Sequence, residues 1–294
     1  MFDEAKMREG VNKASLILKT LEVETVPIEI LQLHALITGD TPNIAEIEAV
    51  ISRNPEVMGR FLSMANQALN RPSDDLVLSV AAAIHLLGLE EIHQLFVLSH
   101  VLKIVPVSSA DQKVLKRCMR AGVAAAELSH WVYGFSRAEV FLVSYMQDIG
   151  ALYMMRHDPI HYRDKFFSQQ PAFPISQYQD EEAHYKTSHC FVGGLVTKRW
   201  NLGSLLYRSV LFHHHQDLQS LAKYDERTAK MVALNRVANF LVFERFSDQF
   251  ATKELEDCFE EACEFIGITE PMLKAADAAL EKWADSEVLP EASH

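Results

Sequence analysis

Helical periodicity is the feature that most constrains the fold, because it runs through almost all of this 294-residue chain. In residues 44–51, for example, apolar side chains recur on one face after the start signal Thr41-Pro42. The chain contains no run of alternating β-branched residues and no Asn-Gly or Asp-Gly hairpin turn. These patterns predict an all-α fold, a multi-helix bundle without a solenoid repeat.

Capping residues mark where several of the predicted helices begin and end. Ser79 precedes a helix that Gly88 ends, and Ser109 and Ser136 precede two long helices at about 110–133 and 137–156. Further helices are predicted at about 188–200, 203–215, 225–246, 252–266 and 270–285. The stretch at 167–182 contains two prolines and several glutamines, so it is predicted as a surface loop.

The chain is long enough for one large domain or two modest ones. A second irregular stretch, at 105–113, suggests a boundary. We therefore predict an N-terminal helical lobe, residues 1–106, packed against a second helical lobe, residues 107–294. The cleft between two lobes is the default place for a binding site.

Charge and composition argue against several classes of protein. The formal net charge is −12, and residues 251–294 carry 12 acidic and 3 basic side chains, so most of that charge lies in this segment. No basic run offers a face to nucleic acid, and none is expected as a partner. No apolar run approaches the ~18 residues of a membrane span, and no signal peptide is recognisable, so a cytoplasmic protein without membrane contact is expected. The four cysteines form no C-x-x-C pair and are expected to be reduced.

Four residues form a candidate metal site: Asp148, His189, His213 and His214. Asp148 lies within an apolar helical stretch, where a carboxylate is costly unless something pairs with it. His189 begins another apolar helix, and the histidine triplet at 213–215 ends a third. On a helix the triplet fans out by about 100° per residue, so at most two of its side chains can face one site. Helical bundles hold metals with aspartate and histidine side chains that come from separate helices. His215, the third residue of the triplet, is expected to face solvent.

Five sequence motifs in order give the chain a family resemblance. Two lie in the N-terminal half and three in the C-terminal half: ISRNPEVMGRFLSMANQAL (51–69), SVAAAIHLLGLEEIHQLFV (79–97), YMQDIGALYM (145–154), HCFVGGLVTKRWNL (189–202) and LFHH (211–214). Each alone is a weak signal. Together they make residues from about 20 to about 240 similar to the HDOD family, relatives of the HD-type metal-dependent phosphohydrolases.

The resemblance implies a degenerate HD-like lobe that has lost metal ligands. Active HD enzymes use a helical histidine, a His-Asp pair and a later aspartate. Here the first falls on Cys118 or Met119, the pair is Gln147-Asp148, and the late aspartate is Asn239. An amide is a poor ligand for a divalent cation beside imidazole or carboxylate. The resemblance therefore implies a vestigial site with low metal occupancy, in which the surviving residues form a buried hydrogen-bond network.

Three functional hypotheses follow. The resemblance implies a non-catalytic bacterial signal-transduction module that acts by protein–protein interaction, with no cofactor. The alternatives are a metal-dependent phosphodiesterase with an altered site, holding iron, manganese or zinc, and a sensor of a small phosphate ligand such as a cyclic dinucleotide. For the sensor, Lys198, Arg199 and Arg208 are candidates to meet a phosphate, because they lie near the histidines in sequence. The oligomeric state and the role of the acidic C-terminal helices are not predicted.

Overall fold

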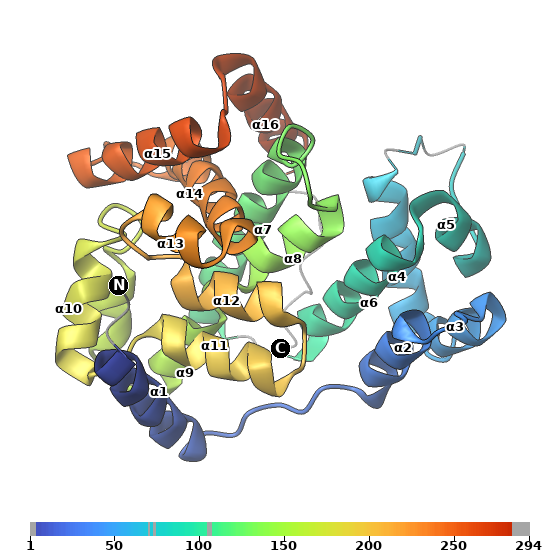
Figure 1. The fold of residues 1–294 in the computed structure, drawn as a ribbon, viewed down its shortest axis with the longest axis horizontal. Coiled ribbons are helices and arrows are strands. Elements are labelled where there is room, and N and C mark those ends of the chain that lie inside the picture. Colours follow the sequence, from blue (N-terminus) through green and yellow to red (C-terminus); the bar gives the residue numbers. More distant parts are fainter. Residues whose placement is uncertain (1–3, 70, 73–74, 105–107, 284–294) are drawn as a thin grey trace.

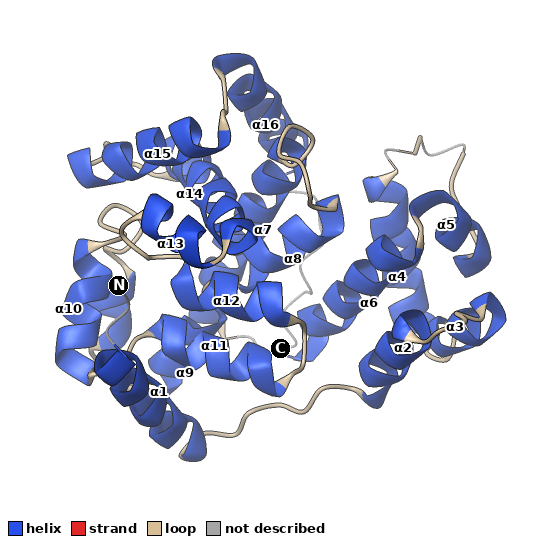
Figure 2. Cartoon of the chain, viewed as in Figure 1, coloured by secondary structure: helices blue, strands red, loops and turns tan. Residues whose placement is uncertain are grey.

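The computed structural model describes residues 4–69, 71–72, 75–104 and 108–283. Within these residues all regular elements are helical, as Figure 2 shows, and the predicted all-α fold is confirmed. The lobe boundary predicted between residues 106 and 107 lies outside the described residues. Among the described helices, none is both long and apolar enough to cross a membrane.

A group of five helices forms one side of the molecule (Figure 1). These helices are α2 (Ile28–Thr38), α3 (Ile44–Ile51), α4 (Pro55–Ala68), α5 (Val80–Leu87) and α6 (Leu89–Ile104). The N-caps Asn43 and Ser79 accept hydrogen bonds from the first turns of α3 and α5, which explains why both helices start where the sequence indicates. Gly88, with a positive φ of 81°, ends α5 as predicted.

The larger group carries the candidate site. It consists of α1 (Glu4–Lys19), α7 (Ser109–Leu128), α8 (Arg137–Met146), α9 (Ile149–His157), the π-helical turn η1 (Tyr162–Phe167), α10 (Ser176–Tyr185), α11 (His189–Arg199), α12 (Ser204–Phe212), α13 (Leu218–Tyr224), α14 (Glu226–Phe246), α15 (Lys253–Ile266) and α16 (Glu270–Trp283). The first helix of the chain packs against α11 and α9, so it lies among helices from the second half of the sequence (Figure 1).

An extended segment at 22–27 joins α1 to α2 and is fastened to the larger group by Glu24. The backbone carbonyl of Glu24 accepts from Trp200 Nε1 at 2.9 Å, and its carboxylate accepts from the Tyr153 hydroxyl and from Arg156. Because Trp200 and Tyr153 are fully buried, this contact holds the linker against the core. The two groups also meet where α6 packs on α8, and one continuous hydrophobic core extends through both.

The structure corrects four details of the predicted helices. The long helix expected at 137–156 is broken at Gln147 and Asp148 into α8 and α9. The N-cap of α7 is Ser108, which forms a capping box with Asp111, and not Ser109. That helix ends at Leu128, and the predicted loop at 167–182 contains α10. The break after α8 matters most, because it frees the Asp148 side chain from a regular helix and turns it toward the histidines.

Candidate metal site

Asp148 sits at the junction of α8 and α9, in the N-cap position of α9, but its carboxylate caps no backbone N–H of that helix. It is almost fully buried, and the partners of its Oδ2 atom come from α7. Arg117 donates to Asp148 Oδ2 over 2.8 Å, and the Cys118 thiol lies 3.5 Å from the same oxygen. One carboxylate oxygen is therefore held by α7, while Oδ1 faces the histidines.

Cys118, not Met119, occupies the position that faces the site. Burial and the neighbouring Asp148 carboxylate raise the pKa of the Cys118 thiol far above its ordinary value. The thiol thus stays protonated and acts as a weak donor to Asp148, where the family resemblance implies a histidine ligand in active enzymes.

His189 is the first residue of α11, and a buried glutamate fixes the orientation of its ring. Its Nδ1 lies 2.7 Å from Glu181 Oε2, and its backbone N–H donates to Glu181 Oε1. Both side chains are buried. A carboxylate that accepts from Nδ1 sets the tautomer and leaves the Nε2 lone pair exposed toward the site, as in carboxylate–histidine–metal arrangements.

His213 follows the last residue of α12 and is fixed in the same sense by the backbone. Its Nδ1 lies 2.8 Å from the Val210 carbonyl oxygen, so the Nδ1 proton is donated there. Its Nε2 then points to His189 Nε2, only 3.2 Å away. Two neutral imidazoles would present two lone pairs to each other at this distance. The arrangement therefore requires a proton or a cation between the two nitrogen atoms.

The three ligand atoms have the spacing of one face of a metal coordination shell. Asp148 Oδ1 lies 3.7 Å from His189 Nε2 and 3.5 Å from His213 Nε2, and the two nitrogens are 3.2 Å apart. The point in the plane of these three atoms that is equidistant from them lies about 2.0 Å from each, close to the bond lengths of zinc to nitrogen and oxygen. Two histidines and a carboxylate on one face also suit iron or manganese. The residues present thus fit a single divalent ion.

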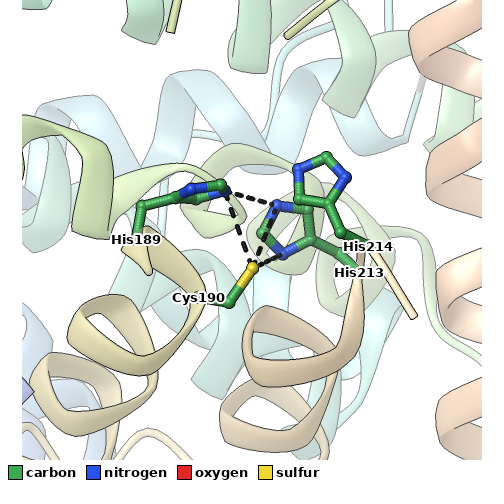
Figure 3. Close-up of side chains that lie close together, drawn as sticks. All are labelled: His189, Cys190, His213 and His214. Carbon is green, nitrogen blue, oxygen red and sulfur yellow. Dashed lines mark hydrogen bonds between the residues drawn. The ribbon is translucent and has the colours of Figure 1, made fainter. Parts of the chain in front are cut away.

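Cys190 and His214 extend this cluster on its other sides. Cys190 Sγ lies 3.6 Å from both His189 Nε2 and His213 Nδ1, and Figure 3 shows the thiol linked to both rings with His214 beside His213. One ligand atom from each of these four residues lies within 4.8 Å of the others. For a hard ion we favour the ligand set of Asp148, His189 and His213, because the Asp148 oxygen approaches both Nε2 atoms. A ligand set that included a Cys190 thiolate would favour zinc.

His214 turns toward Gln170 instead of Asp148. The Gln170 side-chain nitrogen is within hydrogen-bond distance of both His214 Nε2 and His189 Nε2. Gln170 comes from the segment after η1 and is buried, while its Oε1 has no hydrogen-bond partner among the described residues. A neutral amide therefore closes the site on this side.

The charges around the two central histidines favour a shared proton between their Nε2 atoms when no metal is bound. Burial acts to lower the pKa of His189, but Cys190 and Glu181 outweigh it and raise that pKa well above its ordinary value. Burial likewise acts to lower the pKa of His213, but Cys190 and Asp148 raise it to about 9. The site is therefore built to hold positive charge at the point where the nitrogens converge.

Asp148 and His214 complete this electrostatic pattern. Burial acts to raise the pKa of Asp148, but Arg117 and the two central imidazoles hold it well below its usual range, so the residue is an anion. Burial and the nearby His213 lower the pKa of His214 well below its ordinary value, so that ring is neutral and able to accept or ligate.

Gln147 and Asn239, which stand where the resemblance implies two lost metal ligands, form hydrogen bonds with each other. Gln147 Nε2 donates to Asn239 Oδ1 over 3.1 Å, and Asn239 Nδ2 donates back to Gln147 Oε1 over 2.9 Å. Each amide satisfies the other, and the pair is neutral. A second divalent ion would have to break both hydrogen bonds and would gain only weak amide ligands.

The structure brings together all four residues that the sequence suggested, with Asp148, His189 and His213 facing one point and His214 at the edge. His215 is half-buried and lies against Phe212, so the expectation that it faces solvent is only partly met. The sequence reasoning missed Cys190, Gln170 and Glu181. Cys190 stands next to His189, and that adjacency was the available signal.

A cavity of about 420 Å³ lies beside the site, and the three cations suggested for a phosphate do not line it. Arg208 pairs with Asp225 Oδ2, and Lys198 lies over the ring of Tyr207. Lys198 and Arg199 are exposed on the last turn of α11. Their nearness to the histidines in sequence does not become nearness in space, because that turn lies at the opposite end of α11 from His189.

The fold and the site together define an all-α protein with a buried cluster of one aspartate and several histidines. The HDOD domain model matches residues 23–216, and the chain belongs to the HDOD family. No curated protein matches the chain significantly.

Solved structures share the fold over nearly the whole chain. An HDOD domain protein of unknown function from Geobacter sulfurreducens is 18% identical, with a TM-score of 0.66, covering 94% of this chain and 95% of its own. A protein from Shewanella amazonensis SB2B, provisionally named a phosphohydrolase, is 18% identical with a TM-score of 0.65, covering 92% of this chain and 94% of its own. A protein from Marinobacter aquaeolei VT8, provisionally named a signal transduction protein, is 16% identical with a TM-score of 0.54, covering 95% of this chain and 66% of its own.

Proposed function

We propose that this chain is a non-catalytic signal-transduction module that acts by binding a partner protein. The observation that carries the proposal is the closed amide pair of Gln147 and Asn239. Together with the protonated Cys118 thiol, it replaces the charged and imidazole ligands that a two-metal hydrolytic site needs. The HDOD family membership and the neighbour named for signal transduction support the same conclusion.

Turnover assays test this proposal. The purified chain, supplied with manganese, iron or zinc, is incubated with a cyclic dinucleotide and with a generic phosphodiester. We expect hydrolysis no faster than that of Asp148→Ala. Metal-dependent turnover that Asp148→Ala abolishes would overturn the non-catalytic assignment.

A gain-of-ligand variant serves as the matched comparison. Gln147→His combined with Asn239→Asp breaks the amide pair and supplies an imidazole and a carboxylate at the same two positions. We expect this double variant to bind more metal than the native chain, because both new side chains are good ligands for a divalent ion. Equal metal content in the two proteins would show that the amide pair is not what limits binding.

The second candidate is a metal-dependent phosphohydrolase with a single ion. The triangle of Asp148, His189 and His213 favours it, because its dimensions fit one iron, manganese or zinc ion. Such an ion would lower the pKa of bound water and polarise a phosphoryl oxygen. Glu181 would orient His189, and Arg117 would hold Asp148 ionised. Activity that is lost on chelation and restored by one equivalent of metal would establish this candidate.

A further inference from the structure

A cavity of about 420 Å³ opens beside Asp148 and the histidines. Its walls are the face of α7 that carries Lys113 and Arg117, the C-terminal half of α14, and the segment between η1 and α10. This volume lies in the lower part of the range for small-molecule sites, so it suits one small ligand.

The lining is strongly basic although the chain is acidic. The described residues that line the cavity include one carboxylate, Asp148, and five basic side chains: Lys113, Lys116, Arg117, Arg120 and Arg236. The formal net charge of the chain is −12, so this concentration of positive charge runs against the composition. A cleft lined by one sign of charge focuses the field and attracts a ligand of the opposite sign.

Four of the basic residues follow one face of α7, with spacings of three and four residues from Lys113 to Arg120. Like charges at these spacings destabilise an isolated helix. The positive charge of Arg117 is paired with the Asp148 carboxylate, and the charge of Arg236 is paired with the Glu261 carboxylate.

The wall formed by α14 adds an apolar part. Phe243 and Phe246 line the cavity together with Val242, and the Arg120 guanidinium stacks on the Phe246 ring at 3.5 Å. A small inorganic anion would make no contact with these aromatic rings. A ligand with a flat ring beside its anionic group would cover both parts of the lining.

We propose that this cavity binds a small organic phosphate with an aromatic ring, of the size of a nucleoside monophosphate. The phosphate oxygens would accept from the basic face of α7, and the ring would lie against Phe243 and Phe246. This site goes beyond the proposed function: it gives the module a ligand, and it does not depend on whether a metal is bound.

The test is calorimetric titration of the full chain, with and without manganese. The probes are adenosine and guanosine monophosphates, inorganic phosphate, a cyclic dinucleotide and uncharged adenosine. We expect a monophosphate to bind with a Kd below about 1 mM, more tightly than phosphate or adenosine alone, and to weaken as salt is added. Preference for the cyclic dinucleotide would contradict the size assignment.

Substitutions distinguish this site from general attraction to a basic surface. Lys113→Gln with Lys116→Gln changes two exposed side chains and should leave the fold intact, and Arg120→Gln changes the inner wall. Each should weaken the monophosphate at least about tenfold, because hydrogen bonds to charged groups contribute more than neutral ones. Lys223 is exposed on α13 and lies outside the cavity, so Lys223→Gln is the control and should have no effect.

Two results would overturn the proposal: no monophosphate binds, or the double lysine variant and Arg120→Gln bind it as tightly as the Lys223→Gln control. Metal content is measured on the same samples. A failure of ligand binding is thereby distinguished from a failure of the metal site, since each has its own readout.

Discussion

Gly150 allows α9 and α11 to approach each other, and replacing it should disrupt both the fold and the site. A Cβ atom at Gly150 would lie 1.9 Å from the His189 carbonyl oxygen and 2.4 Å from the Gly193 nitrogen. Both neighbours are backbone atoms, so no side-chain rotation can relieve the clash. Ordinary contact begins near 3.4 Å, so Gly150→Ala must separate the two helices by about 1.5 Å.

The expected magnitude follows from two opposing effects. Alanine is favoured over glycine within a helix by about 1 kcal/mol. Overpacking of a well-packed core costs about 1–3 kcal/mol, and the rigid backbone contact at Gly150 places this case at or above the upper end. We therefore expect a net loss of about 2 kcal/mol or more in the free energy of unfolding. Asp148, two residues before Gly150, would also move away from His189, and metal affinity should fall at least about tenfold.

Urea unfolding followed by circular dichroism, together with metal titration, measures both effects. Gly59→Ala is the matched control, because that glycine is exposed within α4 and a Cβ there meets nothing within 4 Å. The control should be stabilised by about 0.5–1 kcal/mol. If Gly150→Ala matched Gly59→Ala in stability, the close packing of α9 on α11 would be wrong.

Three further predictions concern single side chains. Glu181→Gln removes the charge that holds the His189 ring, and metal affinity should fall about 10–100-fold in a titration; unchanged affinity would contradict an orienting role. Cobalt-loaded protein should show no thiolate-to-metal charge-transfer band, because the favoured set of Asp148, His189 and His213 has no sulfur ligand; a band that Cys190→Ser removes would contradict that set. Burial, and then the charge of His34, lower the pKa of His93 to about 4. Between about pH 6.5 and 4 the unfolded chain therefore binds one proton more than the folded chain. From pH 7.5 to 5.5, the free energy of unfolding should fall by about 1 kcal/mol more in the native chain than in His93→Gln. An equal pH dependence of the free energy of unfolding in the two proteins would refute this prediction.

The helices were predictable from the sequence where local signals act alone. Ser79 and Ser136 cap helices that begin where expected, and Asn43 explains the start of α3. The break at Gln147 and Asp148 was not predictable, because no glycine or proline stands there and the flanking residues are apolar. Tertiary contacts to Arg117 and Asn239 stabilise that break, and they come from helices distant in sequence.

The candidate site was predictable only in part. Asp148 and His189 stood out as polar groups in apolar surroundings, which is a local signal. Glu181 and Gln170 lie in a polar stretch without apolar periodicity, because their partners are other polar groups and not the hydrophobic core. The basic face of α7 could have been found from its spacing alone, whereas sequence proximity pointed to Arg208, which pairs elsewhere.

The most direct test of the account is the metal content of the chain purified without a chelator or a histidine tag. The closed pair of Gln147 and Asn239 predicts at most one ion per chain, and the triangle around Asp148 predicts that Asp148→Ala removes any ion that is present. Two ions per chain would contradict the account, since they would require the amide pair to open and a second site to form.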